Sequence, residues 1–416
     1  MFAALRNAFK VPELRRKILF TLGILGLYRL GAHIPVPGVD VKAMQKLFEK
    51  GGVLGFFDLF SGGALSQFAI FALGIMPYIT SSIIMQLLTV VIPKLEEWAK
   101  EGELGQRKIT QITRYLTLAL ALTQSVALTY FFRGQGVIPN FSILNRFLII
   151  ISLTAGTVLI MWLGELISQH GIGNGMSLLI FTSIISRFPV DLVKSFQIAN
   201  PAIIAISVVI IVLVIAAIVI IERGQRRIPV QYAKRVVGRK MYGGQSTYIP
   251  LKINQAGVIP IIFASSVLLF PGTMAQFFRG PVFEAISNAL DPGSWLYLTL
   301  YGLLIVFFTY FYTAITFNPL DISDNMKKYG GFIPGVRPGQ PTALYLNRIL
   351  GRITLPGALF LAAIAILPTI LMAWLNVPFL REFGGTSVLI VVGVALETVR
   401  QLEAQLLMRH YEGFLK

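Results

Sequence analysis

Few side chains in this sequence have the types and spacing that acid–base, nucleophilic or metal chemistry requires. There is no cysteine, which removes disulfides, thiolate metal sites and cysteine nucleophiles. The histidines, His33, His170 and His410, are scattered along the chain, so a histidine-based metal site has little support. The zinc-protease, P-loop and nucleophile-elbow motifs are all missing from the sequence. We therefore expect no catalytic residue, no metal and no cofactor, and we predict that the protein is not an enzyme.

Acidic side chains are almost absent from the apolar segments, where Glu165 and Glu397 lie near segment ends. Ion-coupled carriers and proton pumps usually need acids or histidines inside the membrane, so this pattern argues against both. The glycine-rich stretch Gly171–Gly175 follows no predicted strand. A tight turn between two helices is therefore favoured over a phosphate-binding loop.

Composition indicates the medium in which the chain folds. Hydrophobic residues make up 55% and charged residues 13%, with a mean hydropathy of +0.73, whereas a soluble domain carries about a quarter charged residues. Such a chain could not cover itself with polar surface in water, so the lipid bilayer is the medium that fits. The net charge of +17 fits either nucleic-acid binding or basic loops on an anionic membrane leaflet.

The position of the charges favours the membrane. Apolar runs long enough to cross about 30 Å of hydrocarbon predict an all-α polytopic membrane protein with about ten spans. With the N-terminus placed in the cytoplasm, most Lys and Arg residues fall on the cytoplasmic side, which predicts cytoplasmic location of both termini. The first run reads as a retained span, because no small-residue cleavage site follows it. The runs lie at residues 18–32, 69–92, 113–132, 147–168, 172–188, 201–221, 253–271, 295–317, 353–374 and 385–402.

The spans divide into two sets of five, which predicts an N-terminal half, residues 1–195, and a C-terminal half, residues 196–416. Because five is odd, the halves would have opposite topology, as in the inverted repeats of transporters. Two cytoplasmic loops, 222–252 and 318–352, are long and basic; they are either orientation signals or docking surfaces for a cytosolic partner.

Two features of the N-terminal half are irregular. The segment Gly55–Leu65 is apolar and glycine-rich but too short to span, so it either folds back into the protein or lies on the membrane surface. Pro77 falls inside the second predicted span, where a proline kinks a helix.

Several stretches together resemble the SecY family of protein-conducting channels. They occur in family order and extend over nearly the whole chain. The stretches are Phe60-Ser-Gly-Gly-Ala-Leu65, Ala72-Leu-Gly-Ile-Met-Pro-Tyr-Ile79, Gly171-Ile-Gly-Asn-Gly175, Glu222-Arg-Gly-Gln-Arg-Arg-Ile228, Gln245-Ser-Thr with Pro250-Leu-Lys, Gly257-Val-Ile-Pro260 with Phe263-Ala-Ser-Ser266, Phe332-Ile-Pro-Gly-Val-Arg-Pro-Gly339 and Gly384-Gly-Thr-Ser387.

The resemblance implies two pseudo-symmetric five-helix halves around an hourglass pore, which opens sideways between the second and third and the seventh and eighth spans. Segment 55–68 matches the family's plug, with Phe56, Phe57, Leu59, Phe60, Ser61, Gly62 and Gly63. The family's pore ring falls on Ile75, Ile79, Met176, Ile180, Ile262 and Ile390. Met176 replaces the usual aliphatic residue there, and a flexible apolar side chain would keep the seal.

The resemblance also implies a lateral gate and partners. The gate positions are Thr80, Gln124 and Asn254. The expected partners are the small membrane subunits SecE and SecG, the SecA ATPase motor, the ribosome, signal sequences, nascent polypeptides and membrane lipids. Docking of the motor and ribosome is expected at Arg226, Arg227, Lys234, Arg235, Arg239, Lys240 and Arg337.

The function that these observations favour is passive conduction of unfolded polypeptides through a gated channel in the bacterial cytoplasmic membrane. A small-solute transporter is the alternative, and its sign would be a charged pair at mid-depth, which we do not find. A membrane-embedded enzyme would need a catalytic dyad inside a span, and none is evident.

Overall fold

We describe the protein from a computed structural model. The structure describes residues 9–49, 58, 60–198, 200–232, 235–237, 240–242, 246–277, 289–290, 294–375 and 385–412.

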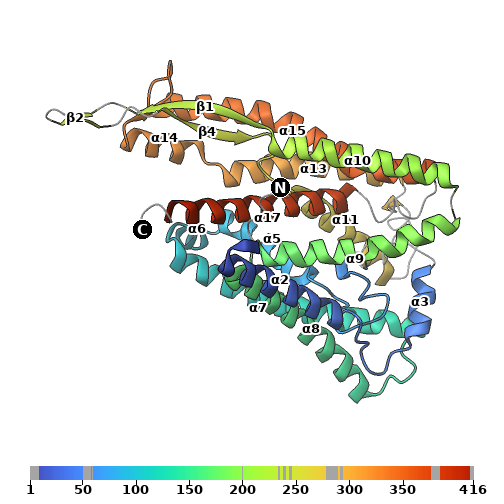
Figure 1. The fold of residues 1–416 in the computed structure, drawn as a ribbon. Coiled ribbons are helices and arrows are strands. Elements are labelled where there is room, and N and C mark those ends of the chain that lie inside the picture. The colour runs from blue at the N-terminus through green and yellow to red at the C-terminus, as the bar shows by residue number, and fades with distance from the viewer. Residues whose placement is uncertain are drawn as a thin grey trace.

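A long helix overlaps each of the predicted apolar runs, and the helices lie side by side as one bundle (Figure 1). Shorter helices and strands fill the connections. The long helices are α2 (Pro12–Gly31), α5 (Met76–Val91), α7 (Glu103–Gly134), α8 (Ile143–His170), α9 (Gly175–Ile198), α10 (Pro201–Arg223), α11 (Ile259–Phe277), α13 (Trp295–Thr316), α15 (Gln340–Leu375) and α17 (Gly385–Glu412). The shorter elements are α3 (Val41–Glu49), α6 (Pro93–Lys100), α14 (Pro319–Lys328), β1 (Gln225–Tyr232), β2 (Arg235–Val237), β3 (Lys240–Tyr242), β4 (Ser246–Lys252) and β5 (Gly331–Phe332).

Six helical segments of the described chain are long and apolar enough to cross a membrane, and α5 with α6, bent by 101°, makes a seventh candidate. Helices α2 and α17 coincide with predicted runs but carry several charged residues. The apolar part of α11 within the described residues is short, Ile259–Leu268. The molecule is thus a multi-pass membrane protein.

The second predicted span differs from the prediction. Residues 62–75 form successive turns, apart from an isolated bridge between Ala69 and Pro35, and α5 begins only at Met76. Pro77 lies in the first turn of α5, where its missing N–H would have no helical partner, so it starts the helix rather than kinking it. The positive φ of Gly74, 57°, belongs to the turn that precedes the helix.

Four large apolar clusters form the interior. One cluster, around Phe68 and Leu153, contains only residues of the first five long helices and their connections. Two others, around Ile305 and around Leu346, contain only residues that follow α10's start. The fourth, which we name the central cluster, combines residues of α2, the 60–75 segment, α8 and α9 with Ile262 and Ile390.

The two long basic loops form one folded module, a result that the sequence analysis did not anticipate. Strand β1 pairs antiparallel with β4, from Gln225 opposite Lys252 to Gln231 opposite Ser246. Strand β5 of the second loop pairs with the end of β1. One face of this sheet packs on α14 and α15 through the cluster around Leu346. The burial of Ile228 and Val230, two residues apart, is the alternation that could have predicted the strand.

The connections between the long helices lie at two opposite ends of the bundle. The paired strands β1 and β4, helix α14 and helix α6 lie at one end, and α3 lies at the opposite end (Figure 1). The expected cytoplasmic connections therefore share one end of the molecule.

Candidate functional site

The six predicted ring residues meet in the central cluster. Ile75, Ile180, Ile262 and Ile390 are buried there, with exposed fractions between 1% and 9%. Ile79 and Met176 are partly buried and pack against the same cluster. Sequence spacing alone gave no reason for these residues to meet, because they come from four separate segments.

The elements explain how they meet. Ile75 is the N-cap of α5 and Ile79 follows one turn later; Met176 and Ile180 have the same spacing on α9. Residues four apart lie on one face of a helix, so each helix presents two neighbouring apolar side chains. Ile262 and Ile390 lie in the first two turns of α11 and α17.

Met176 also packs against α8. A Cβ atom at Gly164 would lie 2.4 Å from the Met176 sulfur, so the absence of a side chain at Gly164 makes room for the thioether. The flexible methionine is thereby held at the junction of α8 and α9.

The described part of the predicted plug segment lies inside the protein rather than on its surface. Phe60, Ser61 and Leu65 are each 2% exposed or less, and Phe60 belongs to the central cluster. Phe56, Phe57 and Leu59, which were also predicted to belong to the plug, lie outside the described residues.

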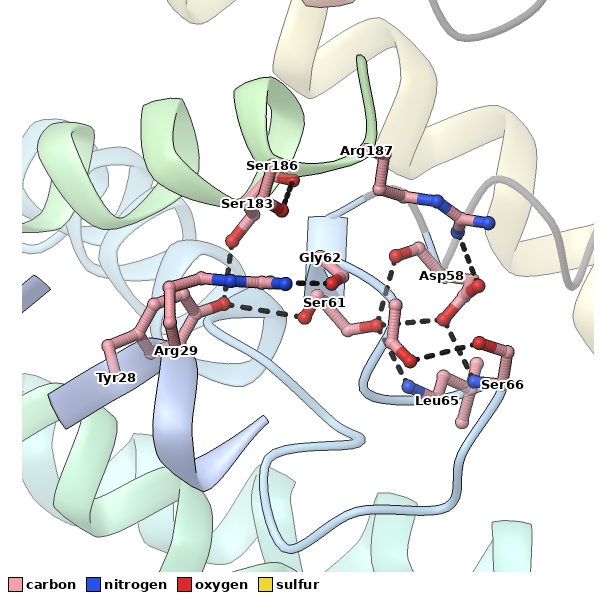
Figure 2. Close-up of polar contacts among 11 residues, drawn as sticks. Tyr28, Arg29, Asp58, Ser61, Gly62, Leu65, Ser66, Ser183, Ser186 and Arg187 are labelled. Carbon is pink, nitrogen blue, oxygen red and sulfur yellow. Dashed lines mark hydrogen bonds and ion pairs between the residues drawn. The ribbon is translucent and has the colours of Figure 1, made fainter. Parts of the chain in front are cut away.

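The loop of residue 58 and residues 60–66, which we name the 58–66 loop, is closed by its own hydrogen bonds (Figure 2). One Asp58 carboxylate oxygen accepts from the Ser66 backbone N–H at 2.9 Å and from the Ser61 hydroxyl at 3.2 Å. The Gly63 N–H donates to the Asp58 carbonyl at 3.0 Å. Asp58 itself is 1% exposed.

Glycines allow this loop to approach α9. Gly62 and Gly63 have φ values of 65° and 89°, which disfavour any residue with a side chain. A Cβ at Gly62 would also lie 3.0 Å from the Ser183 Cα, so the backbones of the loop and α9 touch. The Ser-Gly-Gly sequence follows from this geometry.

Side chains of α2 and α9 hold the loop from outside (Figure 2). The Arg29 guanidinium donates to the Gly62 carbonyl at 2.8 Å, and Arg187 forms an ion pair with Asp58. The Tyr28 hydroxyl lies 2.6 Å from the Ser183 hydroxyl, which joins α2 to α9 beside the loop. Sequence reasoning missed these residues, although a cation inside a predicted span is a signal of function by itself.

The structure does not join the three predicted gate residues by hydrogen bonds within the described chain. The Thr80 hydroxyl donates to the Met76 carbonyl of its own helix, and Gln124 is partly exposed on α7. The Asn254 amide donates to Glu222 at 2.5 Å and to the Gly257 carbonyl at 3.0 Å. Among the described residues its buried carbonyl oxygen has no partner. The gate role of the three stays a prediction.

Three of the predicted docking residues, Arg226, Arg227 and Arg337, belong to the loops that carry β1 and β5. Arg226 and Arg227 are exposed on β1, with the Arg227 guanidinium 4.8 Å from the Tyr248 ring centre. Arg235 and Lys240 lie in β2 and β3, whereas Lys234 and Arg239 lie outside the described residues.

Arg337 is exposed in a loop with a braced backbone. Its carbonyl accepts from the Thr342 hydroxyl at 2.8 Å. Gly335 and Gly339 on either side have φ values of 81° and 96°, which are turn conformations that disfavour any residue with a side chain.

Comparison with known proteins agrees with this arrangement. A family profile described as SecY matches residues 69–399. The protein translocase subunit SecY of Streptomyces scabiei is 52% identical over 437 residues, covering both chains completely. Two solved structures share the fold: one titled the structure of a protein conducting channel, with a TM-score of 0.64, and canine Sec61 in a ribosome–channel complex, with 0.60. They are 18% and 17% identical and cover 93% of this chain and 91% of theirs.

The multi-pass helical bundle and the full-length match to protein translocase subunits define a membrane channel rather than an enzyme. The chain belongs to the SecY family. Its function is that of a protein-conducting translocation channel.

Proposed function

We propose that the chain is a passive, gated pore in the bacterial cytoplasmic membrane, through which unfolded secretory polypeptides cross and transmembrane segments leave sideways into lipid. Its halves, 1–195 and 196–416, surround an hourglass pore, and both termini lie in the cytoplasm. The existence of one apolar cluster confined to the first half and two confined to the second supports this division.

The observation that carries the proposal is the convergence of Ile75, Ile79, Met176, Ile180, Ile262 and Ile390 in the central cluster. An aliphatic constriction has no fixed hydrogen-bond partners to satisfy, so it can deform around any side chain. When empty it resists wetting, which keeps ions from passing. Phe60 of the 58–66 loop packs in the same cluster and adds a second barrier.

The proposed orientation has support in the arrangement of the basic elements. The paired strands β1 and β4 lie with α14 at one end of the bundle (Figure 1). Both connections carry an excess of Lys and Arg, as cytoplasmic loops do. A transmembrane segment of a substrate would leave through the gate near Thr80, Gln124 and Asn254, driven by its transfer from the aqueous pore into lipid.

The energy for transport has to come from a partner, because the sequence contains no nucleotide-binding motif. We propose that the SecA motor and the ribosome dock on the two basic loops, through Arg226, Arg227, Arg235, Lys240 and Arg337. Lys234 and Arg239 of the same loop would take part. SecE and SecG would be the membrane subunits of the complex, and signal sequences and nascent polypeptides its substrates.

Reconstitution into lipid vesicles tests the proposal. With SecE, SecG and SecA supplied, the channel should take up an unfolded precursor in an ATP-dependent manner, and vesicles without the chain should not. Uptake of a small solute without a motor, together with failure to take up the precursor, would instead establish the transporter alternative.

A further inference from the structure

The hydrogen bonds inside the 58–66 loop and the ion pair that joins the loop to α9 use different atoms of Asp58. Inside the loop, one Asp58 carboxylate oxygen accepts from both Ser66 and Ser61. Outside it, the other Asp58 oxygen pairs with Arg187 of α9. The two oxygens of one carboxylate therefore serve two separate purposes.

In the Asp58–Arg187 ion pair, the carboxylate is buried and the guanidinium is partly exposed. Asp58 is 1% exposed, whereas the Arg187 side chain is 23% exposed. A buried carboxylate that loses every partner is strongly destabilising. Asp58, however, would retain its hydrogen bonds from Ser66 and Ser61 if the loop moved away from α9 as a unit. Separation from Arg187 would then cost less than the exposure of an unpartnered buried charge.

The other contacts of the loop with α2 and α9 are weaker or less direct. The Tyr28 hydroxyl lies 3.4 Å from the Ser61 carbonyl oxygen. Its shorter hydrogen bond is to the Ser183 hydroxyl of α9 rather than to the loop. Arg29 donates to a backbone carbonyl at Gly62. Arg29 meets a neutral carbonyl, whereas Arg187 and Asp58 carry opposite charges and also attract each other electrostatically, so the pair with Arg187 is the contact on which attachment depends most.

We propose that the Asp58–Arg187 ion pair is a releasable latch between the 58–66 loop and α9, and that Arg187 is a positioning residue that sets how readily the channel opens for a substrate. The latch rests on the proposed function, because it assumes that the loop closes the pore. Release preserves the internal bonds of the loop, so the same closed form can re-establish itself after a polypeptide has passed.

The test compares variants that break the latch with one that also breaks the loop. Arg187→Gln and Asp58→Asn each remove the charge pair, and asparagine can still accept from Ser66 and Ser61. Asp58→Ala removes both sets of bonds. Arg133→Gln, at the end of α7 with its guanidinium 4.1 Å from the Phe141 ring centre, is the matched control for loss of a cation.

Two readouts are measured on the reconstituted complex: ion conductance of the resting channel in planar bilayers, and export of a precursor with a weakened signal sequence. We expect both to rise severalfold in Arg187→Gln and to a similar degree in Asp58→Asn, with no further rise in the double variant. Asp58→Ala should exceed them, and Arg133→Gln should match the unaltered chain.

Three outcomes would overturn the latch. Unchanged conductance and export in Arg187→Gln would show that the pair does not hold the loop. Additive effects in the double variant would show that the two residues act separately. A lowered melting temperature in detergent with normal conductance of the folded fraction would make the pair merely structural. Failure of the unaltered channel to export any precursor would instead refute the proposed function.

Discussion

Ile79 and Ile262 contribute to the central cluster from two separate helices, α5 and α11. Each is β-branched, so its χ1 angle is restricted and its methyl groups hold a defined position. The proposed constriction would therefore be shaped by the backbone that carries these side chains, and it would widen if those helices moved apart.

Replacing Ile262 by Asn should hydrate the constriction, because a buried amide without partners attracts water. We expect the resting conductance in planar bilayers to rise severalfold, and export of precursors with weak signals to increase. Ile262→Leu is the control, since it keeps the apolar volume. If Asn changes neither quantity while the protein remains folded, residue 262 is only part of the packed interior.

Arg337→Glu should abolish motor-driven export and leave membrane topology intact. The hydrogen bond to its carbonyl fixes the backbone of Arg337, and the exposed planar guanidinium suits recognition of a carboxylate or carbonyl on a partner. The measurement is ATP-dependent uptake of a precursor into vesicles. Arg337→Lys should retain part of the uptake.

Lys328→Glu is the matched control, because Lys328 is an exposed cation of α14 in the same module. A topology signal would respond equally to either charge. Equal loss in both variants, or normal uptake by Arg337→Glu, would therefore remove the docking role from Arg337.

At the scale of elements, contact between α8 and the 60–75 segment depends on a glycine. A Cβ at Gly156 would lie 2.0 Å from the Ile70 carbonyl oxygen, which is backbone and cannot turn aside. Gly156→Ala should therefore destabilise the protein by about 1–3 kcal/mol, the usual cost of overpacking. The melting temperature in detergent measures the change.

Gly26→Ala provides the comparison, since nothing lies within 4 Å of a Cβ at Gly26 and alanine favours a helix. It should leave the melting temperature unchanged or raise it slightly. Equal melting temperatures for the two variants would mean that α8 and the 60–75 segment do not pack as described.

Most of the spans could be predicted from the sequence because they leave a strong local signal, about 20 apolar residues in a row. The start of α5 could not, because a window covering 69–92 does not distinguish a helix from apolar turns. The module of β1, β4 and β5 was not predicted. Its loops are rich in Gly, Pro and basic residues, which indicate irregular structure, and the alternation of buried and exposed residues in β1 is short.

The residues of the candidate site were less predictable from local sequence patterns than the spans. The ring positions were named only through resemblance to a family, since nothing in their spacing unites them. The contact between Asp58 and Arg187 joins residues 129 positions apart. No local pattern reports such a pairing, although a charge inside a predicted span, as at Arg187, indicates that a partner has to exist.

At the scale of the whole molecule, the proposed orientation can be tested with single cysteines, because the chain has none of its own. Lys42 is exposed on α3 and Tyr329 is exposed after α14. In intact cells a membrane-impermeant maleimide should label Lys42→Cys but not Tyr329→Cys, and lysis should make both reactive. Labelling of Tyr329→Cys in intact cells would reverse the topology.

The direct connection of α10 to the paired strands β1 and β4 has a mechanical consequence. The Gly224 N–H continues the hydrogen bonding of α10, and the Ile253 N–H donates to the Gly224 carbonyl, so little slack separates helix from sheet. The eight residues of β1 extend roughly 26 Å at about 3.3 Å each. The paired strands thus form a stiff extension of α10, and one face of their sheet packs on α14 and α15. A push by a cytosolic partner at the far end would reach these helices through hydrogen-bonded and packed contacts rather than be absorbed by a flexible tether.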